Sequence, residues 1–139
     1  MNKELIEICK LLKKSKRIAV IGISRNPDKI SRIIAEFLIN KGYEVFGVNP
    51  NFNNANGIKV YSRLIDIPYD IDIVNVFRKS QDIPEIIPDV IKKNPGALWL
   101  QQGIRNDNAV QPVIENGIFT VQDKCIMVYY NLCKNSNLL

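Results

Sequence analysis

Five short apolar runs, separated by longer amphipathic or polar segments, dominate the pattern of this sequence. The runs cover residues 17–21 (RIAVI), 44–48 (EVFGV), 72–77 (DIVNVF), 97–100 (ALWL) and 118–121 (IFTV). Runs of this length predict strands buried on both faces, as in a parallel sheet that helices cover. Strands alternating with helices form right-handed, doubly wound sheets. We therefore predict an α/β fold: a doubly wound, mainly parallel five-stranded sheet with helices on both faces.

The segments between these strands carry apolar residues at helical spacing. One stripe spans residues 30–38 and is followed by Gly42, a typical residue at a helix end. A second spans residues 83–91, where Pro88 removes one hydrogen bond and so kinks the helix or delays its start. A third stripe, at 109–114, is shorter. Each stripe predicts one helix.

The remaining segments complete a single domain. Residues 1–14 form a leading amphipathic helix, and residues 134–139 form a polar tail. Segment 51–66 is mostly turn material with a short strand at 59–61. The chain has 139 residues, of which 46% are apolar, enough for one core of ordinary size and not for two. We predict one domain over residues 1–139.

The composition excludes several kinds of chemistry. The sequence contains no histidine, which removes the commonest general base and the commonest metal ligand. Cys9, Cys125 and Cys133 form no C-x-x-C pair and leave one cysteine over, so we expect neither a disulfide framework nor a zinc site. No metal site of another kind is expected.

The charge and the chain ends indicate a partner class and a location. The net charge of +5 favours an anionic partner. Neither end has a signal-peptide pattern, and no apolar run approaches the ~20 residues that cross a bilayer. We predict a cytoplasmic protein that binds neither a membrane nor nucleic acid.

Polar side chains follow every predicted strand. The loops after the five strands read GISRNP, NPNF, RKSQ, QQGIR and QDKC. Doubly wound sheets bind ligands beyond the carboxyl ends of their strands, where these loops gather. We predict the binding site at this edge.

The first loop lies in the stretch AVIGISRNPDKISR, residues 19–32. It lacks the G-x-G-x-x-G spacing of a dinucleotide site, because the next glycine after Gly22 is Gly42. A helix that begins near Ser31 would nevertheless present backbone N–H groups to a phosphate, with Ser31 as a cap or donor. Arg25, Lys29 and Arg32 add positive charge. The alternative for Ser31 is a plain N-cap without a ligand.

The second loop distinguishes between nucleotide ligands. An NAD site places an acidic residue at the end of the second strand, where this chain reads Asn49-Pro50-Asn51. An amide and a proline ring tolerate a phosphorylated ribose, as in coenzyme A, whose phosphates carry about four negative charges near neutral pH. NADP also suits the missing acid, but no arginine follows Asn49 directly. The residues at this position favour coenzyme A over NADP as the ligand, and NADP over NAD.

Six short motifs stand in the order and spacing of a known family: IAVIGISRNP, GYEVFGVNPN, SRLIDIP, DIVNVFRK, ALWLQQGI and DKCIM. In this combination the chain resembles the stand-alone CoA-binding proteins, whose fold is that of the CoA-binding domain in the succinyl-CoA synthetase α-subunit. The resemblance covers about residues 15–128. It implies a Rossmann-like domain that holds coenzyme A across its strand ends.

The resemblance also implies the site residues, which belong to the loops after four strands. They are Gly22, Ser24, Arg25, Asn26, Pro27, Ser31, Asn49, Pro50, Phe52, Phe77, Arg78, Gln101 and Gln102. The turn at 24–27 and Ser31 would meet the pyrophosphate, and the second loop would border the adenosine and its 3′-phosphate. Phe77 and Arg78 would flank the nucleotide, and the glutamines would lie beside the pantetheine.

Cys125 is a further candidate contact. It follows the fifth strand, so the thiol end of coenzyme A could approach it, and Lys124 beside it would favour the thiolate. The alternative is a small buried residue without chemistry, because cysteine is commonly buried.

Two departures from the family limit the expected activity. The synthetases pass phosphate through a histidine on a following domain, and this chain has neither, which excludes synthetase activity by the chain itself. Where relatives carry Glu or His after the cysteine, this chain has Tyr129 and Tyr130, which we expect to pack the final turn. We therefore predict a protein that binds coenzyme A or an acyl-CoA without catalysis.

Two alternative functions remain open. One is an NADP-binding oxidoreductase or redox sensor. The other is a CoA-responsive regulatory or interaction module, whose basic N-terminal helix meets an unidentified partner protein.

Overall fold

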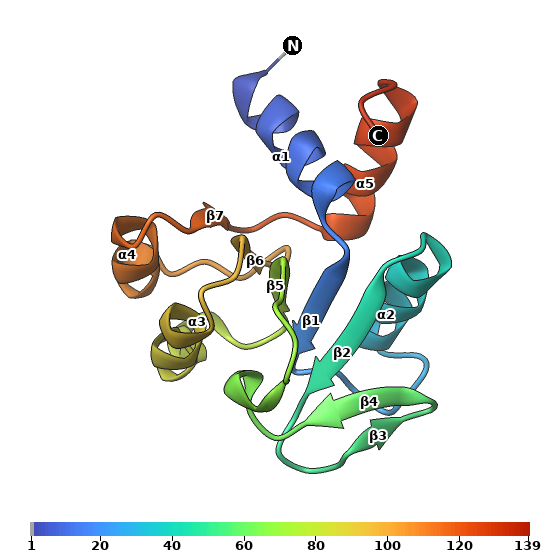
Figure 1. Cartoon of the computed structure of the whole chain (residues 1–139), viewed down its shortest axis with the longest axis vertical. Coiled ribbons are helices and arrows are strands. Elements are labelled where there is room, and N and C mark those ends of the chain that lie inside the picture. Colours follow the sequence, from blue (N-terminus) through green and yellow to red (C-terminus); the bar gives the residue numbers. More distant parts are fainter. Residues whose placement is uncertain (1) are drawn as a thin grey trace.

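In the computed structural model, which describes residues 2–139, the predicted strands form the centre of a seven-stranded sheet (Figure 1). The strands are β1 (Arg17–Ile21), β2 (Glu44–Val48), β3 (Asn54–Ala55), β4 (Ile58–Tyr61), β5 (Ile73–Val76), β6 (Ala97–Leu100) and β7 (Phe119–Val121). Their order is β3-β4-β2-β1-β5-β6-β7, and only β3 and β4 are antiparallel. The predicted α/β class is confirmed, and the predicted strand number of five was too low.

The strands beyond the five form a hairpin: β4 corresponds to the short strand expected at 59–61, and β3 lies in the segment expected to be turn. Asn56 and Gly57 connect β3 to β4 with positive φ angles of 51° and 96°, which suit a two-residue hairpin turn. The loop between β2 and β3 is tied to β4, because Asn49 N–H donates to the Tyr61 carbonyl (2.9 Å) and Val60 N–H donates to the Asn53 carbonyl (3.1 Å). The hairpin thus widens the sheet beside the carboxyl end of β2.

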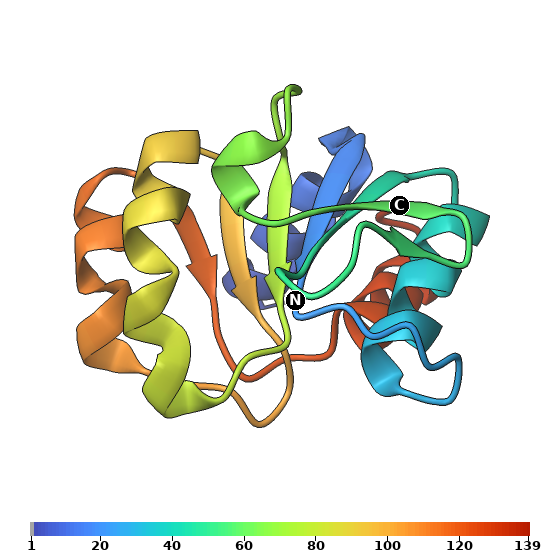
Figure 2. The ribbon, with the colours of Figure 1, turned by 90° about the horizontal axis from the view of Figure 1, so that it is seen from below.

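The strand order creates a crevice between β1 and β5. The chain moves from β1 to β2 and β4 on one side, and from β5 to β6 and β7 on the other. Crossovers on opposite sides diverge at this point, which is where doubly wound sheets bind nucleotides. Figure 2 shows the molecule from the side to which the carboxyl ends of β1 and β2 point.

Helices cover both faces of the sheet, as predicted. The helices α1 (Lys3–Lys14), α2 (Ile30–Asn40) and α5 (Ile126–Asn135) contribute to one core, and η1 (Leu64–Asp66), η2 (Ser80–Glu85), α3 (Ile87–Lys93) and α4 (Asp107–Glu115) contribute to the other. Successive β1 side chains point to opposite faces of the sheet: Ile18 and Val20 pack in the first core, and Ala19 and Ile21 pack in the second. Within residues 2–139, no helix has the length and apolarity to cross a membrane.

The stripe at 83–91 forms two elements instead of one helix. The 3₁₀ segment η2 contains Pro84, and α3 begins only at Ile87, with Pro88 in its first turn. Proline lacks the N–H that a helix interior needs and is tolerated in a first turn. The delayed start therefore follows from the prolines.

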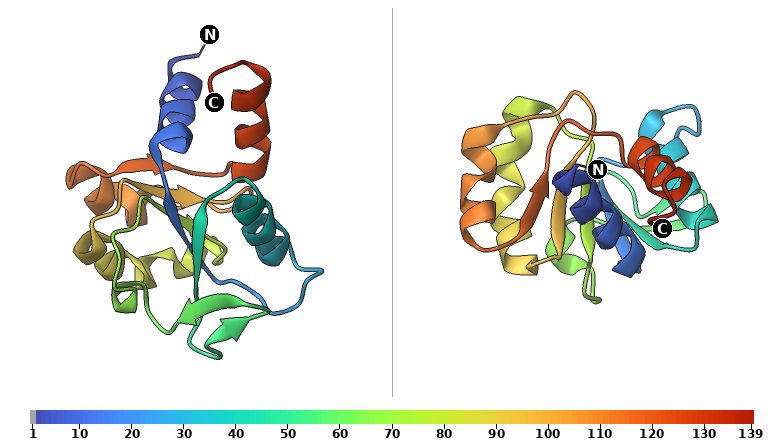
Figure 3. Two further views of the ribbon diagram at one scale, coloured as in Figure 1. Left: turned by 45° about the vertical axis from the view of Figure 1, so that its right-hand side comes forward. Right: turned by 90° about the horizontal axis from the view of Figure 1, so that it is seen from above.

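Cys9 and Cys133 form one disulfide, between α1 and α5, although the cysteine pattern predicts no disulfide framework. The two residues are 124 positions apart, and Cys125 is the cysteine left free. Both bonded cysteines are buried in the core that α1 and α5 share. Figure 3 shows these two helices side by side at the same end of the molecule. Cysteine spacing along the chain does not predict this pairing, because the pairing depends on the contact between two helices at opposite ends of the sequence.

The last segment is more ordered than a polar tail. Helix α5 continues to Asn135, so the expected tail at 134–139 begins inside a helix. Leu138 and Leu139 are half-buried against the core. Tyr130 is buried and meets the rings of Phe37 and Tyr43 edge to face, at centroid distances of 5.5 and 6.2 Å.

Candidate functional site

Gly22, directly after β1, lies where the ends of three strands meet. Its φ of 85° is in the region that favours glycine. Its N–H donates to the carbonyl of Val48 at the end of β2 (2.9 Å). A Cβ here would lie 2.3 Å from the carbonyl oxygen of Phe77, which follows β5. Glycine is therefore required for the backbones to approach this closely at the crevice.

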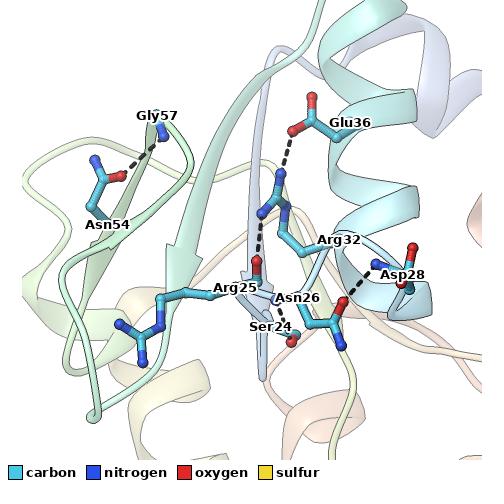
Figure 4. Close-up of polar contacts among 8 residues, drawn as sticks. All are labelled: Ser24, Arg25, Asn26, Asp28, Arg32, Glu36, Asn54 and Gly57. Atoms are coloured by element: carbon cyan, nitrogen blue, oxygen red, sulfur yellow. Dashed lines mark hydrogen bonds and ion pairs between the residues drawn. The ribbon is translucent and has the colours of Figure 1, made fainter.

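The loop between β1 and α2 is organised by its own side chains (Figure 4). The Ser31 hydroxyl accepts from Ser24 N–H (3.0 Å), and the Ser24 hydroxyl accepts from Asn26 N–H (3.0 Å). The Asn26 side chain accepts in turn from Asp28 N–H (2.9 Å). Lys29, not Ser31, is the N-cap of α2, and no side chain caps the helix there. Ser31 thus supports the loop from inside the first turn, so its interpretation as a cap was wrong.

Arg32 does not extend into the site as a free cation. Its side chain is only 3% exposed and donates to the Arg25 carbonyl (3.2 Å) and to the Glu36 carboxylate (2.6 Å). The buried Nε has no hydrogen-bond partner. The contact with the Arg25 carbonyl holds the loop against α2, so the role of Arg32 here is positioning.

Asn49 connects the loops after β1 and β2. Its side-chain amide donates to the Ile23 carbonyl (3.0 Å), and its side-chain oxygen accepts from Asn51 N–H (3.0 Å). Asn49, which the resemblance places beside the adenosine, thus also holds the two loops together. Pro50 beside it is exposed.

A cleft of about 580 Å³ opens at the crevice, and we call it the central cleft. It is lined by Ile21, Gly22, Val48, Asn49, Pro50, Asn51, Ser62, Arg63, Leu64, Arg78, Glu85, Ile86 and Asp89. Four of these residues, Gly22, Asn49, Pro50 and Arg78, were predicted as site residues.

Ion pairs fix the two arginines of the central cleft. Arg63 donates twice to the Asp89 carboxylate, at 2.7 and 3.3 Å. The side-chain hydrogen bond with Asp89 raises the pKa of the Arg63 guanidinium, which therefore stays charged. Arg78 donates to Glu85 at 2.6 Å. Both cations lie in the cleft with their carboxylate partners, so the wall carries both signs of charge.

Two further clefts continue the central one on either side. The outer cleft, of about 500 Å³, is lined by Arg25, Pro50, Asn51, Phe52, Asn53, Asn54, Val60 and Ser62. The β6 cleft, of about 460 Å³, is lined by Ile30, Phe77, Arg78, Lys79, Gln101, Gln102, Ile104 and Cys125. Shared residues, among them Pro50 on one side and Arg78 on the other, join the three clefts along the edge.

Four predicted site residues line none of these three clefts. They are Ser24, Asn26, Pro27 and Ser31. Ser24, Asn26 and Ser31 hydrogen-bond within the loop, and Asn26 and Pro27 are exposed.

Gln101 points its functional group inward. The residue is 4% exposed, and its side-chain oxygen accepts from Ile126 N–H (2.9 Å) and from the amide of Asn75 (3.3 Å). Asn75 is fully buried in β5, and its side-chain oxygen has no partner. Gln102 is exposed. Of the two glutamines, Gln102 is therefore the one whose side chain is open to solvent beside the β6 cleft.

Sequence reasoning missed Ser62, Arg63 and Asp89. Ser62 and Arg63 directly follow β4, so they occupy the same edge as the other loops. Their motif, SRLIDIP, is one of the six that carry the family resemblance, and the sequence predicts a short strand just before it. Treating that strand as part of the parallel sheet would have added its loop to the site.

The edge suits an elongated anionic ligand better than a metal ion. Its polar groups are amides, hydroxyls, the cations Arg25, Arg63, Arg78 and Lys79, and two carboxylates, Asp89 and Glu85, which are paired with Arg63 and Arg78. Over residues 2–139, no three His, Cys, Asp or Glu side chains gather as a metal site would require. Guanidinium groups bind phosphates through paired N–H donors.

Known proteins resemble this chain along nearly its whole length. It is 38% identical over 133 residues to the uncharacterized protein YneT of Bacillus subtilis (strain 168), covering 96% of this chain and 98% of YneT. The solved structure of cell-free ID.343 from Thermus thermophilus superimposes with a TM-score of 0.87 at 32% identity, covering 100% of both chains.

A weaker similarity connects the chain to a much larger enzyme. The ADP-forming acetate–CoA ligase of Methanocaldococcus jannaschii is 27% identical over 89 residues, which are 63% of this chain but 13% of the ligase. Residues 16–131 also match the family model described as the CoA binding domain. The fold, the loop motifs and these similarities agree with the resemblance noted from the sequence: the chain belongs to the CoA-binding domain family.

Proposed function

We propose that this protein binds coenzyme A or an acyl-CoA along the carboxyl edge of its sheet, without catalysing a reaction. The observation that carries the proposal is the series of three joined clefts across the β1 and β5 ends of a CoA-binding domain fold. A long ligand with an anionic nucleotide and an uncharged arm matches a groove of this kind.

The lining residues support an orientation of the ligand. The adenosine lies by Asn49, Pro50 and Phe52, where the central and outer clefts meet. The pyrophosphate lies near the loop after β1, and the pantetheine runs past Phe77 into the β6 cleft. The β6 cleft is the more apolar end because Ile30, Phe77 and Ile104 line it.

The absence of catalysis is part of the proposal. The sequence has no histidine, and the carboxylates of the central cleft, Asp89 and Glu85, are held by arginines. A CoA-responsive regulatory module is compatible with the same site. Turnover of acyl-CoA thioesters by the pure protein above background would refute the non-catalytic proposal.

Ligand-dependent melting tests the binding proposal. Coenzyme A at a hundred times its Kd should stabilise the fold by about 2.7 kcal/mol, as mass action requires. Dephospho-CoA should stabilise it less, and NAD almost not at all. Native mass spectrometry of the protein as purified provides a second measurement. Equal shifts with NAD and coenzyme A would contradict the proposal.

NADP is the second candidate ligand because the loop after β2 contains no acidic residue to repel a phosphorylated ribose. An NADP-dependent oxidoreductase or sensor would show a larger melting shift with NADP than with coenzyme A. The same titration thus decides between the two.

We also propose that the thiol end of coenzyme A reaches Cys125, which is 8% exposed and borders the β6 cleft. With coenzyme A disulfide, the Cys125 thiolate would form a mixed disulfide and release one CoA thiolate. Peptide mapping should find the adduct at Cys125. A folded, CoA-binding protein without that adduct would leave Cys125 as a packing residue.

A single domain over 1–139 and a cytoplasmic location remain proposals as well. The Cys9–Cys133 disulfide provides the test of location, because disulfides are rare in cytosolic proteins. Rapid trapping of thiols in cells should find these two cysteines reduced if the location is cytoplasmic.

A further inference from the structure

The loop between β2 and β3 contains no charged residue of its own. Between the end of β2 and the start of β3 it reads Asn49, Pro50, Asn51, Phe52 and Asn53. The outer cleft beside this loop is lined by amides, a hydroxyl and apolar groups, and by one charged side chain, Arg25. Arg25 comes from the neighbouring loop after β1. Any electrostatic recognition in the outer cleft therefore depends on that residue.

Arg25 is held across the gap between the two loops. Its guanidinium carbon lies 4.6 Å from the centroid of the Phe52 ring, a cation–π distance. Its backbone carbonyl accepts from the buried Arg32 (3.2 Å), which Glu36 fixes in turn. Figure 4 shows the Arg25 side chain extending away from Arg32, toward the side of Asn54 and the hairpin. Both ends of Arg25 are thus positioned by the protein.

Arg25 differs from every other arginine in the part of the chain that the structure describes. The others form ion pairs with carboxylates: Arg17 with Glu44, Arg32 with Glu36, Arg63 with Asp89, Arg78 with Glu85 and Arg105 with Asp107. Among residues 2–139 no carboxylate pairs with Arg25 within 4.0 Å. Contact with a ring uses the face of the guanidinium and leaves its N–H edge open to an anion.

We propose that Arg25, stacked on Phe52, recognises a phosphate monoester on the ribose of the bound nucleotide and so sets specificity for the phosphorylated ligand. The inference rests on the proposed binding of coenzyme A, whose 3′-phosphate would lie in the outer cleft. The outer cleft adjoins the central cleft, because Pro50, Asn51 and Ser62 line both. Arg25 supplies the cation that the β2 loop lacks.

Calorimetric titrations of Arg25→Gln test this role. The variant should bind coenzyme A about tenfold or more weakly, as expected for the loss of a charge-assisted contact, and should bind dephospho-CoA as the unaltered protein does. Arg25→Lys should recover part of the affinity. Phe52→Leu should shift the ratio of the two affinities in the same direction by a smaller factor, because the ring orients the guanidinium. Arg17→Gln, at the other end of β1, removes the same charge and should change neither affinity.

Nucleotide fragments identify the phosphate that is recognised. Adenosine 3′,5′-bisphosphate should bind more tightly than 5′-AMP to the unaltered protein and equally to Arg25→Gln. If adenosine 2′,5′-bisphosphate binds more tightly than the 3′,5′ isomer, the site recognises the 2′-phosphate of an NADP-type ribose. If coenzyme A binds and Arg25→Gln leaves the ratio of coenzyme A to dephospho-CoA affinity unchanged, the inference is wrong while the proposed function stands. If the unaltered protein binds no coenzyme A, the proposed function fails first.

Discussion

The two ends of the sheet are built in different ways. At the carboxyl edge, polar loops meet around Gly22, and their side chains bond to one another and leave three joined clefts. At the amino end, α1 and α5 close over the sheet with a disulfide and a cluster of buried rings. The Tyr43 hydroxyl, just before β2, donates there to the carbonyl of Leu12 in α1 (2.5 Å).

These differences indicate that the amino end of the sheet contributes mainly to stability and the carboxyl edge mainly to ligand binding. Covalent and apolar contacts between elements far apart in sequence stabilise the amino end, whereas the carboxyl edge relies on polar contacts within and between its loops. We therefore expect that changes at the amino end alter the free energy of unfolding and spare ligand affinity, and that changes at the carboxyl edge alter affinity more strongly.

Removing the disulfide should have the largest effect. In the chain-entropy view, closing a loop of 124 residues stabilises the fold by about 5 kcal/mol. The double variant Cys9→Ser with Cys133→Ser should lose up to that amount in urea denaturation and keep its affinity for coenzyme A. Cys125→Ser is the matched control and should unfold near the unaltered midpoint. Equal stability of all three proteins would show that the disulfide adds nothing to the amino end.

Gly22→Ala should have the next largest effect, and it should act on both properties. The alanine Cβ would meet the Phe77 carbonyl oxygen at 2.3 Å in a backbone of φ 85°, so the two strand ends must separate. We expect a cost of about 2–3 kcal/mol in thermal unfolding and a loss of coenzyme A affinity. Gly117→Ala, also at positive φ but with no neighbour within 4 Å, controls for backbone strain. Unchanged affinity in a folded Gly22→Ala protein would oppose placing the ligand at this crevice.

Ionisation of Tyr43 at alkaline pH should have a graded effect on stability, confined to the amino end. Burial, with a smaller contribution from Tyr130, raises the pKa of Tyr43 from 10.0 to about 12. The unfolded chain then ionises first, so stability is complete below pH 10 and falls by up to about 1.4 kcal/mol per pH unit as pH rises toward 12. Tyr43→Phe should flatten this part of the profile relative to the unaltered protein. If the stability profiles of the variant and the unaltered protein run parallel with pH, then folding does not change the pKa of Tyr43.

The fold was predictable because its signals are local. Apolar runs and stripes located β1, β2, β5, β6, β7 and the helices α1, α2 and α4, since burial on one or two faces imposes a period on the sequence. The hairpin was harder to recognise, because β3 has two residues and the Asn56-Gly57 turn lies in an asparagine-rich stretch. Helix α5 was missed because its segment, CIMVYYNLC, mixes buried and exposed apolar residues without a clear stripe.

The sequence by itself determined the α/β class, the edge at which the loops gather and the family. It also determined which residue types stand at that edge, because loops that follow parallel strands reach the same side of the sheet. Only the tertiary structure decided how those residues are used. Ser31 and Asn49 bond to the backbone of neighbouring loops, Arg32 is buried beneath its loop, and Arg25 extends over a ring from another loop. The Cys9–Cys133 disulfide was likewise decided by packing. Such contacts join residues that are distant along the chain or depend on side-chain direction, and neither property leaves a period in the sequence.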